Sequence, residues 1–377
     1  MPTRTVKKMK LNAQGQRLLT IIGVIVALVL IVFIFYRSNI NSLKKIGYSE
    51  KAANTILFKF KKDYCLKLGK NKTLNAAFES SDYIEDNLDT YSKIKYRKQE
   101  HLIRNINKLI KKKYSNDQIS TIITHGDDKS VTEFTKRDKV RYLDEFYTLD
   151  YAKISLYDRY VDFMNKSRED AENTVVYVNL DLDKENYKDY SFVKDFSYSM
   201  LVNKHRALSP KFIPPKLVKV NKEYWVDKDK VEGNETAVRA LETMIAAASK
   251  KGMQILVSSG YRSYDEQKET ENTYLKLYGE NYVNKFVAHA GFSEHQTGLA
   301  FDFASAKKTI FATSDEYVWM LENAYKYGFV YRFPKGSEEI TGFTSEPWHF
   351  RYVGKKIAKK CHDEDITFDE YFAKYIY

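Results

Sequence analysis

The sequence predicts an α+β protein whose main domain follows a mostly helical region and one N-terminal transmembrane helix. Three observations lead to this prediction. Residues 18–36 form an apolar run without charge, and residues 37–195 are rich in Lys, Asp, Asn and Tyr but poor in Gly and Pro. Residues 196–377 then mix helical and strand patterns in an irregular order, as α+β domains do. A chain of 377 residues is long enough for two or more such parts.

The apolar run from Leu18 to Tyr36 has the length of a membrane span. At about 1.5 Å per residue, its 19 residues nearly cross a hydrocarbon core of about 30 Å. Basic residues are more frequent before the run than after it: Arg4, Lys7, Lys8, Lys10 and Arg17 against Arg37, Lys44 and Lys45. This bias predicts a cytoplasmic tail at residues 1–17 and places everything after residue 37 outside the cytoplasm.

A cleaved signal peptide is the alternative interpretation of the same run. The apolar part of a signal peptide is usually shorter and ends in small residues, whereas this run ends in the bulky Phe33, Ile34, Phe35 and Tyr36. We therefore expect a retained single-pass anchor at residues 18–36.

Residues 37–195 contain a weak repeat. Ser49, Ser115 and Ser167 are each followed by apolar residues about one and two helical turns later, which predicts three helix N-caps. Such a repeat favours a spacer or binding module. Ordinary capped helices in a small bundle, or a region that inhibits or positions the main domain, are the alternatives.

Residues 196–377 supply the main domain. Residues 201–217, which contain Ser209-Pro210 and Pro214-Pro215, have the pattern of an extended lead-in. Apolar spacing then predicts helices at residues 236–250, 264–277 and 316–327, the last ending at Gly328, and strands at residues 253–257, 299–304, 329–331 and 348–353.

Asp302 lies within one of these predicted strands. Side chains alternate across a strand, so Leu299, Phe301 and Phe303 share a face that suits the core. Asp302 then projects from the opposite face between two alanines, which leaves room for a metal ion and a substrate. A carboxylate buried there without a partner would be costly, and a metal or a salt bridge would satisfy it.

Two histidines lie in tight polar clusters that complement Asp302. His295 precedes the strand, and Gly298 permits a turn that folds it back beside the strand. His349 is the second residue of the last predicted strand, which starts at Trp348. His289 and Glu294 are close in sequence to His295, and either one competes as a ligand or supports the ligands from outside.

Glu346 stands three residues before His349, at the wrong parity for a straight strand. Pro347 interrupts the ladder there, so Glu346 is free to lie at the mouth of the strand and face the metal. Two His, one Asp and an open fourth position are typical of a catalytic zinc. A free carboxylate beside it fits a general base, which points to hydrolysis.

Arg262 lies in a predicted strand-to-helix turn, Ser259-Gly260-Tyr261-Arg262-Ser263. A guanidinium group binds a carboxylate through two parallel hydrogen bonds, and Gln267 in the next helix could lie beside it. A surface ion pair is the alternative for Arg262.

Together these residues resemble the zinc D,D-carboxypeptidases of the VanY type, in the group that also holds lysostaphin-like and D-Ala-D-Ala dipeptidase enzymes. The matching segments are Ser258–Ser263 with Gln267, Ser293–Asp302, Ala324–Phe329 with Arg332, and Glu346–Gly354, with Asn203-Lys204 as the lead-in. The resemblance covers residues 196–365. It implies a small zinc-peptidase domain, at residues 196–377, with a central, mainly antiparallel sheet flanked by helices.

The resemblance also implies a function. Zn²⁺ would be held by His295, Asp302 and His349, with Glu346 as general base. Arg262, Gln267 and Ser293 would contact the substrate, and Arg262 would thereby take part in catalysis. The activity would be removal of the C-terminal D-alanine from peptidoglycan stem peptides, D,D or L,D, by attack of a zinc-bound water, outside the bacterial cell membrane.

Two departures from the family pattern stand out. The family often has Tyr after the Arg of its Arg-Tyr-Pro motif, whereas Phe333 follows Arg332 here. If that Tyr donates a hydrogen bond to the substrate, Phe333 lacks it. Ala290-Gly291 replaces the usual Pro-Gly, which should only loosen a turn.

The net charge of +12 favours an acidic partner, such as anionic lipids or anionic wall polymers. A merely solvated basic surface is the alternative. No zinc finger, RNA-binding aromatic motif or basic recognition helix supports nucleic acid as a partner. The alternative functions are a peptidoglycan cross-link endopeptidase and a non-catalytic wall-binding or scaffold protein that acts through residues 37–195.

Overall fold

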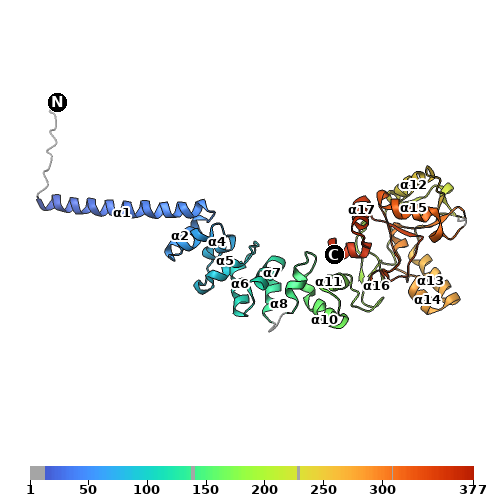
Figure 1. Cartoon of the computed structure of the whole chain (residues 1–377), viewed down its shortest axis with the longest axis horizontal. Helices are drawn as coiled ribbons and strands as arrows, with labels where there is room; N and C mark the ends of the chain where they lie inside the picture. Colours follow the sequence, from blue (N-terminus) through green and yellow to red (C-terminus); the bar gives the residue numbers. More distant parts are fainter. Residues whose placement is uncertain (1–12, 137–140, 227–229, 308) are drawn as a thin grey trace, which may run out of the picture. The chain divides into compact units, whose positions relative to one another are not determined.

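The computed structural model describes residues 13–136, 141–226, 230–307 and 309–377, so residues 1–12 of the predicted tail lie outside the described residues. The chain divides into two compact units, Met1–Thr148 and Leu149–Tyr377 (Figure 1). The second unit begins before residue 196, the predicted start of the main domain. Helix α11 (Ala171–Asn179) explains this, because it packs on the C-terminal helix α18 (Phe368–Tyr375), where Asn179 Nδ2 donates to the Ala373 carbonyl.

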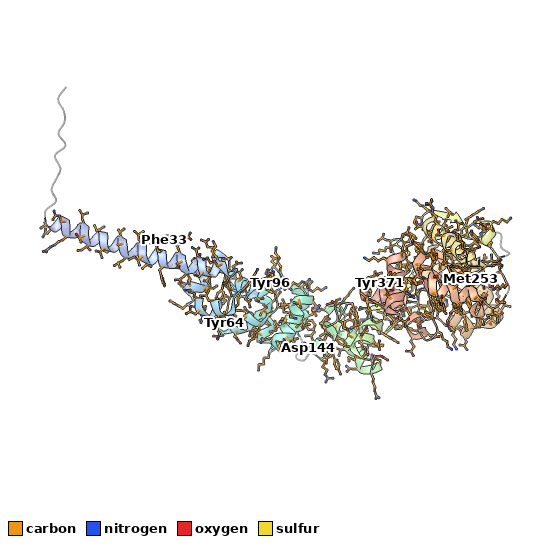
Figure 2. All side chains as sticks on the ribbon, turned by 45° about the horizontal axis from the view of Figure 1, so that its top comes forward. Phe33, Tyr64, Tyr96, Asp144, Met253 and Tyr371 are labelled. Atoms are coloured by element: carbon orange, nitrogen blue, oxygen red, sulfur yellow. The ribbon has the colours of Figure 1, made fainter. Side chains whose placement is uncertain are left out.

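The first unit begins with the long helix α1 (Ala13–Lys45), which contains the apolar run. Its apolar side chains, Phe33 among them, project outward around the helix (Figure 2). By length and composition α1 meets the requirements of a membrane span, and an N-terminal signal sequence would meet them too. Near the end of α1, Ile40 and Leu43 are buried against the helices that follow.

Short helices build the rest of the first unit. They are α2 (Glu50–Phe58), α3 (Lys62–Leu68), α4 (Lys72–Glu79), α5 (Leu88–Lys93), α6 (Leu102–Lys111), α7 (Asn116–His125), α8 (Asp128–Thr135) and α9 (Leu143–Tyr147). The predicted caps at Ser49 and Ser115 are confirmed, since Ser49 Oγ accepts from the Ala52 amide and Ser115 forms a capping box with Gln118.

The predicted cap at Ser167 is wrong. Ser167 is the last residue of α10 (Tyr157–Ser167), and the carboxylate of Asp170 caps α11 instead, accepting from the Asn173 amide. The next residue, Arg168, has a left-handed φ of 63°, so the helix cannot continue beyond Ser167. The chain therefore turns between the two candidate caps, and the second one starts the helix.

The largest sheet among the described residues of the second unit has four strands. Its order is β5 (Ile255–Ser259), β6 (Ala300–Ser305), β8 (His349–Tyr352) and β7 (Phe329–Tyr331), and all neighbours are antiparallel. Two smaller sheets pair β1 (Ser191–Phe192) with β2 (Arg206–Ala207) in parallel and β3 (Leu217–Lys219) with β4 (Glu232–Asn234) antiparallel. The helices are α10 and α11, then α12 (Glu235–Ser249), α13 (Tyr264–Tyr278), α14 (Glu280–Phe286), α15 (Asp315–Asn323), α16 (Glu338–Thr341), α17 (Lys355–Glu364) and α18.

The helix predicted at residues 316–327 is α-helical only to Asn323. A 3₁₀ segment, Ala324–Tyr327, completes it, and Gly328 with a φ of 94° ends it as predicted. The four predicted strands exist, with bounds shifted by up to two residues at either end. The fold therefore has the predicted combination of helices and small, mostly antiparallel sheets.

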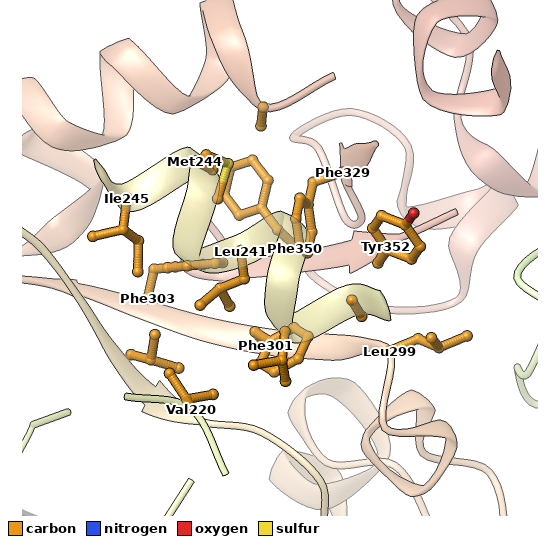
Figure 3. Close-up of a cluster of buried hydrophobic side chains, with 14 of the residues drawn as sticks. Val220, Leu241, Met244, Ile245, Leu299, Phe301, Phe303, Phe329, Phe350 and Tyr352 are labelled. Atoms are coloured by element: carbon orange, nitrogen blue, oxygen red, sulfur yellow. The ribbon is translucent and has the colours of Figure 1, made fainter. Parts of the chain in front are cut away.

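The core lies between one face of this sheet and helix α12 (Figure 3). Phe301 and Phe303 of β6 are at most 2% exposed and join Leu241 and Met244 of α12. Each such side chain stabilises the fold by about 1.5–3 kcal/mol through burial. A slip of one residue in β6 would move Phe301 and Phe303 to the other face, so their burial fixes the direction in which Asp302 points.

Candidate functional site

Three predicted ligand residues meet at the four-stranded sheet, two of them on its inner strands β6 and β8. His295 lies in the 3₁₀ segment Glu294–Thr297, Asp302 in β6 and His349 in β8, and one potential ligand atom from each lies within 4.8 Å of the others. His295 Nε2 is 3.3 Å from Asp302 Oδ2, and His349 Nδ1 is 3.2 Å from Asp302 Oδ1. Asp302 therefore stands between the two imidazoles.

Strand register brings Asp302 and His349 together. The two residues are direct partners in the antiparallel pair of β6 and β8, and Phe301 is paired with Phe350 on the core face. This confirms the predicted alternation along both strands.

Gly298 brings His295 to the same place. It ends the 3₁₀ segment with a φ of 66°, and its amide donates to the His295 carbonyl. A Cβ at this position would lie 3.2 Å from Asn234 N, Leu217 Cδ2 and Pro214 Cγ. Glycine is needed here both for the backbone conformation and for space.

The second nitrogen of His295 has a hydrogen-bond partner that fixes which nitrogen faces the cluster, and the second nitrogen of His349 faces a carboxylate. His295 Nδ1 is 2.7 Å from the Gly260 carbonyl, so it carries the proton and leaves Nε2 free as an acceptor. His349 is turned the other way, with Nδ1 toward Asp302 and Nε2 3.5 Å from Glu294 Oε2. The Gly260 carbonyl thus fixes the His295 ring from outside the cluster, as is usual for metal-binding histidines, whereas the Glu294 carboxylate faces His349 Nε2 without a hydrogen bond.

Glu294 belongs to a buried network behind His349. Its Oε1 accepts from Arg332 Nε at 2.8 Å and from Arg351 Nη1 at 3.0 Å, and Arg332 Nη1 also donates to Asp369. The side chains of both arginines and of Asp369 are fully buried. Burial raises the pKa of Glu294, but the two guanidinium groups outweigh it and hold that pKa well below its usual range.

His289, the other sequence candidate near His295, lies apart from the cluster. Its Nδ1 is 2.7 Å from Glu271 Oε1, and its ring packs edge-on against Tyr187. Of the two competitors that the sequence left open, Glu294 therefore supports His349 from outside the cluster, and His289 forms a separate pair.

The donor set fits zinc. Two imidazole nitrogens and one carboxylate are the ligand types of catalytic zinc sites, which keep one position open. Asp302 Oδ1 is buried and makes no hydrogen bond with any described residue. Burial raises the pKa of Asp302, but the neighbouring imidazoles lower it well below its usual range, so the group is a carboxylate that lacks a full set of partners.

Glu346 lies beside this cluster. Its Oε2 is 3.5 Å from His349 Nδ1, and its side chain is only 12% exposed. Burial raises the pKa of Glu346 to about 7. Pro347 separates Glu346 from β8, and the Glu346 amide donates to the Phe333 carbonyl, which holds the residue at the end of the sheet.

Arg262 and Gln267 form the opposite side of the site. Arg262 Nη1 donates to Gln267 Oε1 at 2.6 Å, and the buried Gln267 donates in turn to the Ala288 carbonyl. The Arg262 amide donates to the His295 carbonyl, which ties the turn after β5 to the histidine. Ser293 Oγ accepts from the His295 amide, a bond that does not use its hydroxyl proton.

One cavity of about 210 Å³ is lined by all seven predicted site residues: Arg262, Gln267, Ser293, His295, Asp302, Glu346 and His349. Phe333 also lines it and packs on His349, with ring centroids 5.0 Å apart. This part of the wall is therefore apolar, where the family pattern often supplies a hydroxyl. Tyr274, Tyr282 and Phe286 add an aromatic side that comes from α13 and α14.

Three residues that support the site were not predicted from the sequence: Gly260, Arg351 and Asp369. The carbonyl of Gly260 holds His295, and Arg351 and Asp369 complete the network around Glu294. Strand alternation put Arg351 on the same face as His349, which was the one available signal. Asp369 lies in the C-terminal helix beyond the recognised motifs, and nothing in its local sequence points to the site.

Sequence comparisons place the region that contains the cavity in a known family. The VanY family, D-alanyl-D-alanine carboxypeptidase, matches residues 230–355. The bifunctional D-Ala-D-Ala dipeptidase and D-Ala-D-Ala carboxypeptidase VanXYC of Enterococcus gallinarum is 33% identical over 178 residues, which cover 45% of this chain and 91% of that protein.

The chain belongs to the VanY family. It is also 43% identical over 182 residues to the putative carboxypeptidase YodJ of Bacillus subtilis strain 168, covering 46% of this chain and 66% of that protein. Among solved structures, a zinc complex of a mutant vancomycin resistance D,D-pentapeptidase VanY is 29% identical, with a TM-score of 0.41 and coverage of 47% of this chain and 99% of that one.

Residues 230–355, which match the VanY family, contain all seven predicted site residues that line the cavity. The match is confined to part of each protein. The chain spans 66%, 52% and 40% of the lengths of three curated relatives. The helical first unit lies outside the residues matched to the family.

Proposed function

We propose that the protein is a zinc-dependent carboxypeptidase that removes the C-terminal D-alanine from peptidoglycan stem peptides, D,D or L,D. The observation that carries this proposal is the single cavity that contains the two-histidine and one-aspartate cluster, Glu346 and Arg262. Release of a C-terminal residue in this way requires a metal site, a general base and a cationic side chain that binds the terminal carboxylate of the substrate.

His295, Asp302 and His349 would hold the zinc through Nε2, a carboxylate oxygen and Nδ1. When bound, zinc supplies a water molecule with a pKa lowered to about 7 and polarises the scissile carbonyl. Gly260 keeps His295 in the tautomer that this binding needs, and the nearby carboxylate of Glu294 would favour the His349 tautomer with its proton on Nε2.

Glu346 acts as general base and then as general acid. Its carboxylate accepts a proton from the attacking water, whose oxygen bonds to the scissile carbonyl carbon. The same proton then passes to the amine nitrogen as the C–N bond breaks, so D-alanine leaves with a neutral amine and Glu346 is again a carboxylate. Burial raises the pKa of Glu346, which makes its carboxylate a stronger base than an exposed one.

Arg262 binds the terminal carboxylate of the substrate. The guanidinium group can form two parallel hydrogen bonds to a carboxylate, and Gln267 holds it in place from behind. The Ser293 hydroxyl has a proton left to donate to the same carboxylate or to the scissile carbonyl. A free substrate carboxylate is what distinguishes a carboxypeptidase from the cross-link endopeptidase considered above.

We also propose that α1 is a retained anchor. The N-terminus would then lie in the cytoplasm, and the second unit, Leu149–Tyr377, which we call the catalytic unit, would lie outside the membrane. The helices between α1 and the catalytic unit would then act as a spacer or a wall-facing region. A reporter fused to the C-terminus tests the topology, and reporter activity in the cytoplasm would contradict it.

The activity is tested with pentapeptide and tetrapeptide stems, with and without a chelator, by measuring released D-alanine. We expect release from at least one stem, loss with chelator and recovery with added zinc. Glu346→Gln should keep zinc but lose turnover, and the matched surface variant Glu339→Gln should keep both. Zinc-loaded protein that releases nothing from either stem would exclude the proposed activity.

A further inference from the structure

Two aromatic side chains beside α1 have no role in the proposed function. Phe58 ends α2, and Phe60 follows it in the turn to α3. They are 78% and 94% exposed, which makes them the most exposed large hydrophobic side chains among the described residues. The large apolar side chains between Leu18 and Tyr36 of α1, at 41–68%, are less exposed. We call Phe58 and Phe60 the aromatic tip.

The aromatic tip lies close to the point where α1 leaves the predicted membrane span. After the turn at residues 46–49, Glu50 pairs with both Lys44 and Arg37 of α1, and one turn later Asn54 accepts from the Tyr36 hydroxyl at 2.7 Å. Helix α2 therefore returns toward Tyr36, the last residue of the apolar run. Phe58 lies one further turn along, about 6 Å beyond Asn54.

Helix α3 holds this arrangement from the other side of the tip. Lys62 Nζ donates to Asn39 Oδ1 at 2.6 Å, so the residues before and after the tip are both bound to the same part of α1. Figure 1 shows α2 beside the last turns of α1, and Figure 2 marks Tyr64 of α3. Phe60 has a left-handed φ of 56°, a conformation that is uncommon for an aromatic residue.

Lysines surround the aromatic tip. Residues 44–72 contain nine lysines against two acidic residues, Glu50 and Asp63. Lys59 and Lys61 both pair with Glu85, and Lys44 pairs with Glu50, whereas Lys67 and Lys70 are exposed. Aromatic rings at the depth of the lipid headgroups, with lysine side chains reaching the phosphates, are typical of segments that lie in a membrane interface.

We propose that Phe58 and Phe60 insert into the membrane surface next to α1 and that the surrounding lysines bind anionic phospholipid headgroups. The proposal rests on the proposed role of α1 as a retained anchor. Insertion would give α2 and α3 a second attachment to the membrane, so the first unit would not pivot freely about the turn at residues 46–49. The partner is a lipid surface, and neither a protein nor a second copy of the chain is required.

The test uses the full chain with Phe60→Trp, reconstituted into vesicles that contain anionic phosphatidylglycerol with brominated acyl chains. Bromine quenches tryptophan only at short range within the bilayer. Trp225, Trp319 and Trp348 all belong to the catalytic unit. Their fluorescence is a background that is measured with the parent protein and subtracted. Tyr96→Trp, at a 40% exposed site on the same unit, is the matched control.

We expect the tryptophan of Phe60→Trp to be quenched and blue-shifted, more strongly in anionic than in zwitterionic vesicles, and the tryptophan of Tyr96→Trp to be unaffected. As a second measurement, trypsin should cleave after Lys59 and Lys61 slowly in vesicle-bound parent and faster in Phe58→Ser/Phe60→Ser. Both aromatic residues are exposed, so this variant should still fold.

The outcomes separate this proposal from the anchor on which it rests. Parent protein that alkaline carbonate extracts from the vesicles overturns both. Parent protein that resists extraction, while Phe60→Trp is quenched no more than the control, overturns the aromatic-tip proposal alone. A blue shift that grows with protein density and is not accompanied by bromine quenching would indicate contact between copies of the chain. That result would also overturn the aromatic-tip proposal.

Discussion

Replacing Glu294 by Gln should destabilise the catalytic unit and loosen the hold on His349. Glu294 is the only carboxylate among the described residues that contacts Arg351, whereas Arg332 also has Asp369. Gln keeps the shape of the side chain and one acceptor oxygen, but it removes the negative charge. The variant therefore leaves a buried guanidinium group whose other partners are backbone carbonyls, those of Tyr352, Met200 and Tyr198.

The size of the effect follows from burial. Glu294 is 3% exposed and both arginines are 0% exposed, so solvent screens these interactions little. Removing one partner of a buried ion pair costs about 3–5 kcal/mol. We expect about 3 kcal/mol, the lower end of that range, because the Gln oxygen still accepts a hydrogen bond. Zinc affinity should fall by about 10–100-fold, the usual effect of losing a residue that orients a ligand.

Urea denaturation followed by tryptophan fluorescence measures the loss of stability. All three tryptophans, Trp225, Trp319 and Trp348, lie in the second unit, so the signal reports on that unit alone. Asp363→Asn is the control, since it removes a carboxylate from an exposed pair with Lys359 on α17 and should leave the midpoint unchanged. Zinc affinity is measured separately by competition with a chelating dye.

An unchanged urea midpoint in Glu294→Gln would refute the reasoning, because it would mean that the buried network does not contribute to stability. A lowered midpoint with unchanged zinc affinity would confirm the network and refute its role in positioning His349.

Four further predictions follow from the same geometry. The pKa of Glu294 in the folded protein is held below its unfolded value of about 4.3. The stability that ionised Glu294 contributes is therefore fully present above that pH and is lost as the pH falls. Between about pH 5 and pH 3 the free energy of unfolding should decrease more in the parent protein than in Glu294→Gln. Gly298→Ala should destabilise the unit by about 1 kcal/mol or more and weaken zinc binding, because alanine strains a φ of 66° and approaches three neighbours; a calorimetric melt and zinc titration check this. Phe333→Tyr places a hydroxyl in the cavity and should change kcat or the preference between pentapeptide and tetrapeptide stems, without altering zinc content. Arg262→Lys should raise KM at least several-fold while zinc content stays at the parent level, because lysine cannot form the paired hydrogen bonds to a carboxylate.

The positions of Asp302 and His349 could be predicted from the sequence because they follow from local periodicity. Phe301 and Phe303 must face the core, and with a period of two the residue between them must face the other way. The same rule applies to His349 and Phe350. The interruption at Pro347 could also be predicted from the sequence, because proline has no backbone N–H to donate to a neighbouring strand.

The choice of ring nitrogen could not be predicted in this way. His295 faces the cluster with Nε2 and His349 with Nδ1, because their other nitrogens meet the Gly260 carbonyl and Glu294. Both contacts join residues that are far apart in sequence. The cap at Ser167 failed for a different reason, since Ser167 and Asp170 satisfy the same local rule and only the turn at Arg168 decides between them.

The boundary of the catalytic unit shows where composition stops being informative. Residues 149–195 share the Lys- and Tyr-rich composition of the first unit, yet α11 packs on α18 and Asn179 binds the Ala373 carbonyl. The same helix α18 carries Asp369, which reaches Arg332 and through it Glu294 and His349. Helix α11 thus supports the helix that completes the network behind the proposed zinc site. A fragment that starts at residue 196 would leave one face of α18 uncovered, so the catalytic unit should be produced from Leu149 onward.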